Sequence, residues 1–121
     1  MGNFQKTKQY DLEDRTFEFA RKTRELVKKI PKTTGNFEDG KQLIRSSGSV
    51  GANYIEANEA LSKKDFCLRV KISRKEAKES RYWLRLIDAG EKQSLEQDRE
   101  NLINEATELM KIFNAIVFKS K

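Results

Sequence analysis

Apolar residues recur at steps of three and four positions along almost the whole chain, and this spacing constrains the fold more than any other feature. Such a period places the apolar side chains on one face of an α-helix. No segment alternates apolar and polar residues in the way a half-buried strand does. The sequence therefore predicts an all-α protein.

The helical segments are separated by start and stop signals. Pro31 ends the first segment, because the residue before a proline is pushed out of the α region. Asn36, Ser62 and Ser94 are residue types that cap a helix N-terminus, and Gly90 suits a left-handed C-cap. The expected helices cover about residues 12–30, 37–60, 63–89 and 95–118.

Four helices joined by short connectors pack most simply as an antiparallel, up-down-up-down four-helix bundle. We expect this bundle to occupy residues 11–118, after a flexible N-terminal segment at residues 1–10. The inward row of the second helix is expected to extend to Leu61. Gly48 and Gly51 fall inside that helix, where each costs about 1 kcal/mol relative to alanine. That cost predicts a structural reason, such as close approach by a neighbouring helix.

The composition excludes several kinds of site. The chain has no histidine and one cysteine, Cys67, so it can form neither a zinc site of the Cys/His kind nor a Cys–His or Ser–His nucleophile pair. We expect no metal, no cofactor and no enzymatic activity. No apolar run approaches the ~18 residues of a membrane span, and the N-terminus lacks the apolar core of a signal peptide. We therefore expect a cytoplasmic location.

The excess positive charge is confined to the third expected helix. Residues 62–87 include nine basic and three acidic residues, a surplus of +6 that equals the net charge of the whole chain. At about 100° per residue, eight of these cations fall on one side of the helix and only Arg69 falls on the other. This basic stripe can follow a phosphate backbone, and the alternative is a solvated face that keeps the protein soluble. The residues expected to contact nucleic acid are Lys71, Arg74, Lys75, Lys78, Arg81 and Arg85.

An apolar strip lies outside the core face of the same helix and is formed by Leu68, Ile72, Trp83 and Leu86. A bundle needs only one inward row per helix, so this strip is either a subunit interface or a side wall against a neighbouring helix. We expect an interface, because tryptophan and tyrosine are enriched at interface centres. Phe17 of the first helix is expected to belong to the same contact.

Two segments carry a family resemblance. Residues 42–50 and 53–57 resemble the second-helix signature of a bacterial four-helix-bundle family encoded in intervening sequences of large-subunit ribosomal RNA genes, and residues 76–84 resemble its third-helix signature. Asn53 and Glu56 match this signature, while Ala57 stands where many members have glycine. From the sequence we interpret Asn53 and Glu56 as a buried hydrogen-bonded pair or a cap for the glycine-weakened turn, and the alternative is a ligand or interface contact.

The resemblance implies a bundle that assembles as a ring of five subunits with a basic surface. It also implies a reverse transcriptase partner, because related proteins are accessory proteins of diversity-generating retroelements and are thought to bind nucleic acid. With the basic stripe, these features predict a non-enzymatic oligomer that binds nucleic acid, RNA more than DNA. No aromatic ladder accompanies the stripe, so we expect backbone contacts with little sequence readout. The alternative is a protein–protein adaptor that does not bind nucleic acid.

Overall fold

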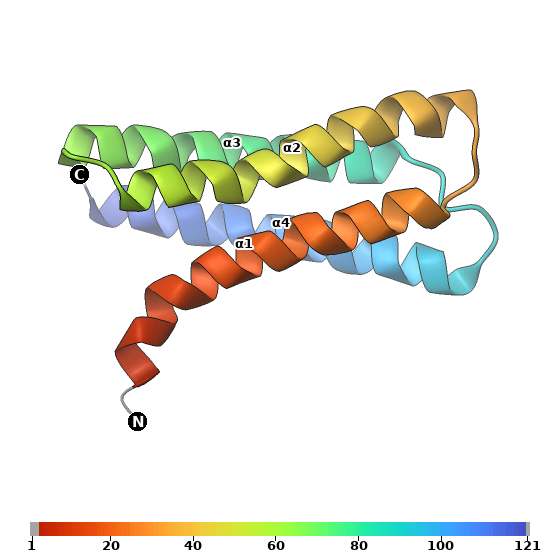
Figure 1. The fold of residues 1–121 in the computed structure, drawn as a ribbon. Helices are drawn as coiled ribbons and strands as arrows, with labels where there is room; N and C mark the ends of the chain where they lie inside the picture. The colour runs from red at the N-terminus through yellow and green to blue at the C-terminus, as the bar shows by residue number, and fades with distance from the viewer. Residues whose placement is uncertain (1–2, 121) are drawn as a thin grey trace.

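The computed structural model describes the backbone of residues 3–120 and the side chains of residues 12–120. Each helix packs against its two neighbours around a square, and successive helices run antiparallel (Figure 1). The described residues contain no strand, so the predicted all-α, up-down-up-down bundle is confirmed. The helices are α1 (Asn3–Lys29), α2 (Thr34–Asn58), α3 (Lys63–Leu86) and α4 (Gln93–Lys119).

The flexible segment predicted at residues 1–10 stays a prediction. Residues 1 and 2 and the side chains of residues 3–11 lie outside the part that the structure describes. From Leu12 onwards, each helix contributes one apolar row to a continuous core. The largest fully buried apolar side chains are Phe19, Leu26, Leu43, Val50, Val70, Leu84, Leu109 and Phe113.

Small side chains and hydroxyls fill the contact between α2 and α3. The Oγ atoms of Ser46 and Ser80 lie 2.9 Å apart and share a hydrogen bond, and Ser73 Oγ donates to the carbonyl oxygen of Val50 at 2.9 Å. Ser73, Ala77 and Ser80 are all fully buried. Small residues allow the two helices to approach closely, and the hydrogen bonds satisfy hydroxyls that burial would otherwise penalise.

Asn36 does not cap α2 as predicted. The N-cap is Thr33, whose side-chain oxygen accepts a hydrogen bond from the backbone N–H of Asn36 at 3.1 Å. The Asn36 side chain instead joins the two connectors at one end of the bundle. Its Nδ2 donates to the carbonyl oxygens of Pro31 (3.0 Å) and Asp88 (2.8 Å), and its Oδ1 accepts from the backbone N–H of Asp88 (2.8 Å). This tertiary contact takes the side chain away from the helix end.

Helix α3 begins as predicted but ends earlier. Ser62 Oγ accepts a hydrogen bond from the backbone N–H of Asp65 at 3.0 Å, which makes it the N-cap. The helix ends at Leu86, so Gly90 is left-handed (φ 77°) within the connector and is not the C-cap. A Cβ on Gly90 would also lie 2.8 Å from Cγ of Pro31. The meeting of the two connectors therefore requires glycine there.

Two other predictions about helix ends were wrong. The carbonyl oxygen of Lys92 accepts the first helical hydrogen bond of α4, from the N–H of Glu96 at 3.2 Å, so Ser94 lies inside the first turn and is not the N-cap. Helix α2 ends three residues before Leu61. Leu61 therefore lies in the connector and is fully exposed, because an inward row continues only as far as its helix does.

Gly48 and Gly51, the two glycines of α2 singled out from the sequence, have different surroundings. A Cβ on Gly51 would lie 2.9 Å from Oγ1 and 3.1 Å from Cβ of Thr16 in α1. A Cβ on Gly48 would meet nothing nearer than the guanidinium of Arg24, at 3.7 Å. The close approach expected from the sequence is confirmed at Gly51 only.

Gly51→Ala should lower the free energy of unfolding by about 1–3 kcal/mol, because the added methyl group overpacks the contact with Thr16. Gly48→Ala is the matched control. It should leave the stability unchanged or raise it by up to about 1 kcal/mol through helix propensity. Urea unfolding followed by circular dichroism measures both changes. Equal effects of the two substitutions would contradict this account of the α1–α2 contact.

Candidate nucleic-acid interface

Helix α3 presents three faces with different chemistry. Its inner face is buried in the core. The flank next to α4 carries the basic stripe, since Arg74 and Arg81 both hydrogen-bond to side chains of α4. The flank next to α2 carries the apolar strip and Arg69, which reaches Asn53 of α2. Arg69, the one cation placed off the stripe by the helical period, therefore does lie on the other flank.

The cations of the stripe differ in how they are held. Lys71, Lys75 and Lys78 are exposed, as is Arg85. The other two arginines are half-buried: Arg74 Nη1 donates to Asn114 Oδ1 at 2.7 Å, and Arg81 Nη1 donates to Thr107 Oγ1 at 3.1 Å. Both acceptors are neutral, so they orient the guanidinium groups without cancelling their charge.

No carboxylate in the described part of the chain forms an ion pair with a cation of the stripe. Among the described residues, the cation of every ion pair within 4.0 Å comes from α1, α2 or α4. The acids of α3 lie elsewhere, because Asp65 is at the helix start and Glu76 and Glu79 fall on the flank next to α2. An exposed row of uncompensated cations creates a positive potential that attracts anionic partners.

Two aromatic residues beside the stripe were missed by the sequence reasoning. Tyr82 is 55% exposed and follows Lys78 by four residues, so it lies on the same face of α3. Phe118 is 78% exposed and follows Asn114 by four residues, which places it on the α4 face that holds Arg74. The helical period alone could have placed Tyr82, since it assigns this residue to the angular range of the stripe.

The apolar strip is divided between the core and the surface. Leu68 and Leu86 are 54% and 50% exposed, and Ile72 is half-buried. Trp83 packs against the core, and its Nε1 is buried without a hydrogen-bond partner. Trp83 thus serves as a side wall, while the two leucines remain available for a contact with another molecule.

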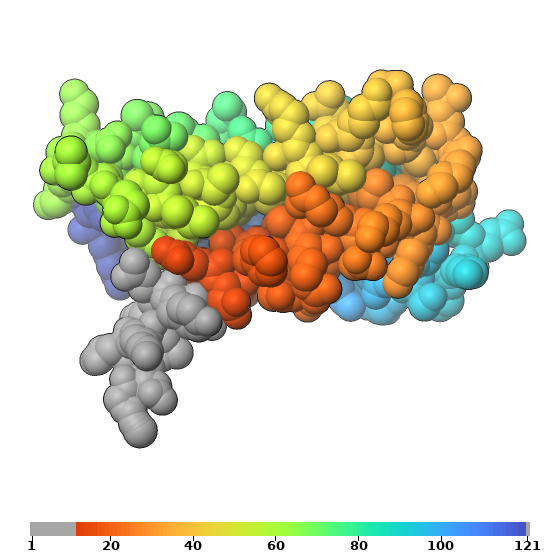
Figure 2. Space-filling view, in the orientation of Figure 1, coloured from red at the N-terminus to blue at the C-terminus, as the bar shows by residue number. Residues whose placement is uncertain are grey.

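Within one chain Phe17 lies apart from the apolar strip, and its part in the same contact between subunits stays a prediction. It lies on α1, which occupies the corner of the bundle diagonally opposite α3 and makes no helix contact with it. Phe17 instead lines a hollow of about 470 Å³ between α1 and α2, together with Ile55 and the glycines of α2. Both Phe17 and Ile55 are exposed. Figure 2 shows this face, where α1 and α2 lie side by side.

Asn53 forms a polar link between α2 and α3. Its Nδ2 donates to the carbonyl oxygen and to Oγ of Ser49, both at 2.9 Å, and its Oδ1 accepts from Arg69 Nη1 at 3.2 Å. Glu56 is exposed, so the interpretation of Asn53 and Glu56 as a buried pair is wrong. The two side chains differ because only Asn53 lies next to α3.

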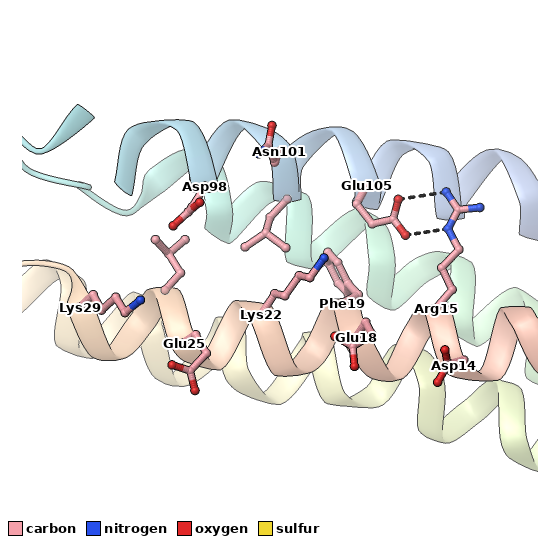
Figure 3. A pocket seen from close by; sticks show the side chains of 12 residues that line it. Asp14, Arg15, Glu18, Phe19, Lys22, Glu25, Lys29, Asp98, Asn101 and Glu105 are labelled. Carbon is pink, nitrogen blue, oxygen red and sulfur yellow. Dashed lines mark hydrogen bonds and ion pairs between the residues drawn. The ribbon is translucent and has the colours of Figure 1, made fainter. Parts of the chain in front are cut away.

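The largest of the described hollows lies between α1 and α4 and has a volume of about 630 Å³ (Figure 3). Arg15 bridges it by donating from Nε and Nη2 to the carboxylate of Glu105, at 2.7 and 2.9 Å. Five carboxylates and three cations line this hollow, and Figure 3 shows Lys22 between the bridge and the end of the hollow where Asp98 and Lys29 lie. With more negative than positive groups, it does not suit a phosphate backbone.

Neither a metal centre nor a membrane span is found in the part of the chain that the structure describes. There, no three His, Cys, Asp or Glu side chains are grouped so that they could hold a metal ion. No helix in the same part is apolar over a length sufficient to cross a bilayer.

The fold and the surface together define a class: a four-helix bundle with one uncompensated basic helix face. The model of the 23S rRNA-intervening sequence protein family matches residues 8–115, and the chain belongs to that family, as the sequence resemblance predicted. A crystal structure from Bacteroides thetaiotaomicron, of a protein with unknown function from the S23 ribosomal protein family, is 34% identical. The match has a TM-score of 0.75 and covers 87% of this chain and 96% of that one. No curated protein matches the chain significantly.

Glu76 lies in an unfavourable environment for a carboxylate. Burial raises the pKa of Glu76, and the nearby charge of Glu79 raises it further, while Lys75 and Arg45 lower it in part. Its Oε1 is buried without a hydrogen-bond partner. The ionised side chain therefore costs stability in the folded protein.

Glu76→Gln should raise the free energy of unfolding at pH 7.5. The folded-state pKa lies above the unfolded-state value, so the cost of ionising Glu76 is fully present above the folded-state pKa and disappears as the pH falls through it. The stability difference between variant and wild type should consequently shrink towards pH 4. Denaturant unfolding at several pH values measures it, with Glu91→Gln at an exposed position of the α3–α4 connector as the control. A difference that grows as the pH falls would contradict this assignment.

Proposed function

We propose that the protein is a non-enzymatic homo-oligomer that binds nucleic acid, RNA in preference to DNA, through the basic stripe of α3. The single observation that carries this proposal is that no described carboxylate pairs with the cations of α3. Phosphates would supply the missing negative charge. The description of the family, 23S rRNA-intervening sequence protein, associates it with ribosomal RNA and favours RNA as the ligand.

Binding would depend mainly on the nucleic-acid backbone. Arg74 and Arg81 are seven residues apart, which is about 10.5 Å along a helix, and their neutral acceptors hold both guanidinium groups in place. Arginine suits bidentate contacts with phosphate, whereas Lys71, Lys75 and Lys78 act as point charges. Such contacts fix position and carry little sequence information.

We further propose that the chain assembles as a closed ring, with five subunits as the family resemblance implies. Leu68 and Leu86 expose apolar surface on α3, and Phe17 and Ile55 expose a second apolar surface on the α1–α2 face. Two different apolar surfaces on one chain suit head-to-tail contacts, which close into rings. A ring would repeat the stripe on each subunit, so weak contacts would add through multivalency. A reverse transcriptase partner and a cytoplasmic location stay predictions.

Reversing three charges of the stripe should abolish most nucleic-acid binding. Lys71→Glu/Lys75→Glu/Lys78→Glu changes side chains that are exposed, so the fold should survive. We expect the affinity for a 20-nucleotide RNA to fall at least about tenfold and the salt dependence of log K to lose about three units of slope. Fluorescence anisotropy at salt concentrations from about 50 to 200 mM measures both.

The matched control is Arg24→Glu/Lys32→Glu/Lys41→Glu, which makes the same change in net charge on exposed residues away from α3. It should bind nearly as wild type does. Equal losses in the two triple variants would mean that only net charge matters. If the Lys71→Glu/Lys75→Glu/Lys78→Glu variant binds RNA with the affinity of the wild type, the stripe is only a solvated face. That result would favour the protein–protein adaptor.

Leu68→Glu/Leu86→Glu should dissociate the ring. Burying each leucine is worth about 1.5–3 kcal/mol, and a carboxylate in its place would have to be desolvated. Both side chains are half-exposed in the isolated bundle, so its helical content should stay unchanged. Sedimentation equilibrium at micromolar concentration checks this prediction. A wild-type monomer under these conditions would overturn the proposed assembly.

A further inference from the structure

Tyr82 occupies a position within the basic stripe that a purely electrostatic surface does not need. Lys75 and Lys78 precede it by seven and four residues and Arg85 follows it by three, so all three cations share its face of α3. The ring is held in place, because it packs edge-on against Trp83 with centroids 5.0 Å apart and an interplanar angle of 77°. More than half of Tyr82 nevertheless remains exposed.

Phe118 provides a second exposed ring towards the other end of the stripe. Asn114, one turn earlier on α4, is bonded to Arg74, and the carbonyl oxygen of Ser120 lies 4.0 Å from Sγ of Cys67 on α3. Phe118 lies between these two contacts in the sequence and therefore beside the N-terminal half of α3. It is 78% exposed, so its ring is accessible to another molecule.

Exposed aromatic rings beside a row of cations favour one kind of nucleic acid. Bases stack on aromatic side chains only when they are unpaired and unstacked, as in single strands and loops. The bases of a duplex already stack on one another, so a duplex could use the cations of the stripe but not the rings. Stacking adds affinity without sequence readout, because every base has a π-face.

We propose that the stripe selects single-stranded nucleic acid, whose unpaired bases stack on Tyr82 and Phe118 while its phosphates contact the cations of α3. This inference rests on the proposed function and adds the structural class of the ligand. The phosphates account for the salt dependence, and the two rings account for the preference over a duplex.

The test compares a fluorescently labelled 20-nucleotide single-stranded RNA with the same strand annealed to its complement. Wild-type protein should bind the single strand more tightly. Tyr82→Leu and Phe118→Leu keep an apolar side chain but remove the ring, and each should weaken single-strand binding about 5- to 150-fold. Their affinity for the duplex and their salt dependence should stay unchanged.

Two controls separate stacking from other roles. Tyr82→Phe retains the ring and should bind the single strand as wild type does. Phe37→Leu removes an exposed ring on α2, away from the stripe, and should have no effect. Trp83, the single tryptophan of the chain, is in edge contact with Tyr82 and gives an independent readout. Its fluorescence should change when the single strand binds and not when the duplex binds.

Two results would overturn the whole inference, and a third would overturn the role of Tyr82 in it. Equal wild-type affinity for single strand and duplex would remove the selectivity, and undiminished single-strand binding by both leucine variants would remove the stacking. A change of oligomeric state in Tyr82→Leu would assign Tyr82 to the subunit contact near Leu86. The stacking proposal would then depend on the loss of single-strand affinity in Phe118→Leu alone. If RNA binding still depends on salt when one of these results is obtained, the proposed function is retained. Absence of binding to both RNAs overturns both proposals.

Discussion

The hydrogen-bonded contact between α2 and α3 determines how the rest of the surface is arranged. The pairs Ser46–Ser80 and Ser73–Val50 form only when α3 is at one rotation about its own axis. Any other rotation would separate the buried Ser73 hydroxyl from the Val50 carbonyl oxygen, and a buried hydroxyl left without its partner costs about 1–3 kcal/mol. Because that rotation is fixed, the cations of α3 are turned towards α4 and solvent, and the apolar strip is turned towards α2.

The helical period predicts the fold because each helix buries one continuous row of side chains. The helix ends were harder to predict, because several residues near each end have suitable capping chemistry and distant contacts choose among them. Thr33 and Asn36 could both cap α2, and Asn36 is drawn away by Asp88, 52 residues further along the chain. The spacing of Leu61 is correct for the inward row of α2, but the helix stops before reaching it.

The candidate surface was predictable to the extent that it depends on one helix. The one-sided charge of α3 follows from an angle of about 100° per residue, and the ion pairs of the structure leave that charge uncompensated. What other helices contribute could not be deduced from the sequence. The neutral acceptors of Arg74 and Arg81 belong to α4, and the burial of Trp83 depends on its neighbours in the core. The separation of Phe17 from the apolar strip within one chain also could not be deduced, because the period of α1 does not tell which corner of the bundle α1 occupies.

The side chain of Asn36 makes the two ends of the bundle mechanically unequal. Its three hydrogen bonds join the α1–α2 connector to the α3–α4 connector, and Pro31 and Gly90 pack together beside them. At the opposite end a single connector joins α2 to α3, and its Leu61 makes no buried contact (Figure 1). The α1–α2 and α3–α4 hairpins are therefore held together by side-chain contacts at one end of the bundle. Local separation of the two hairpins should begin at the other end.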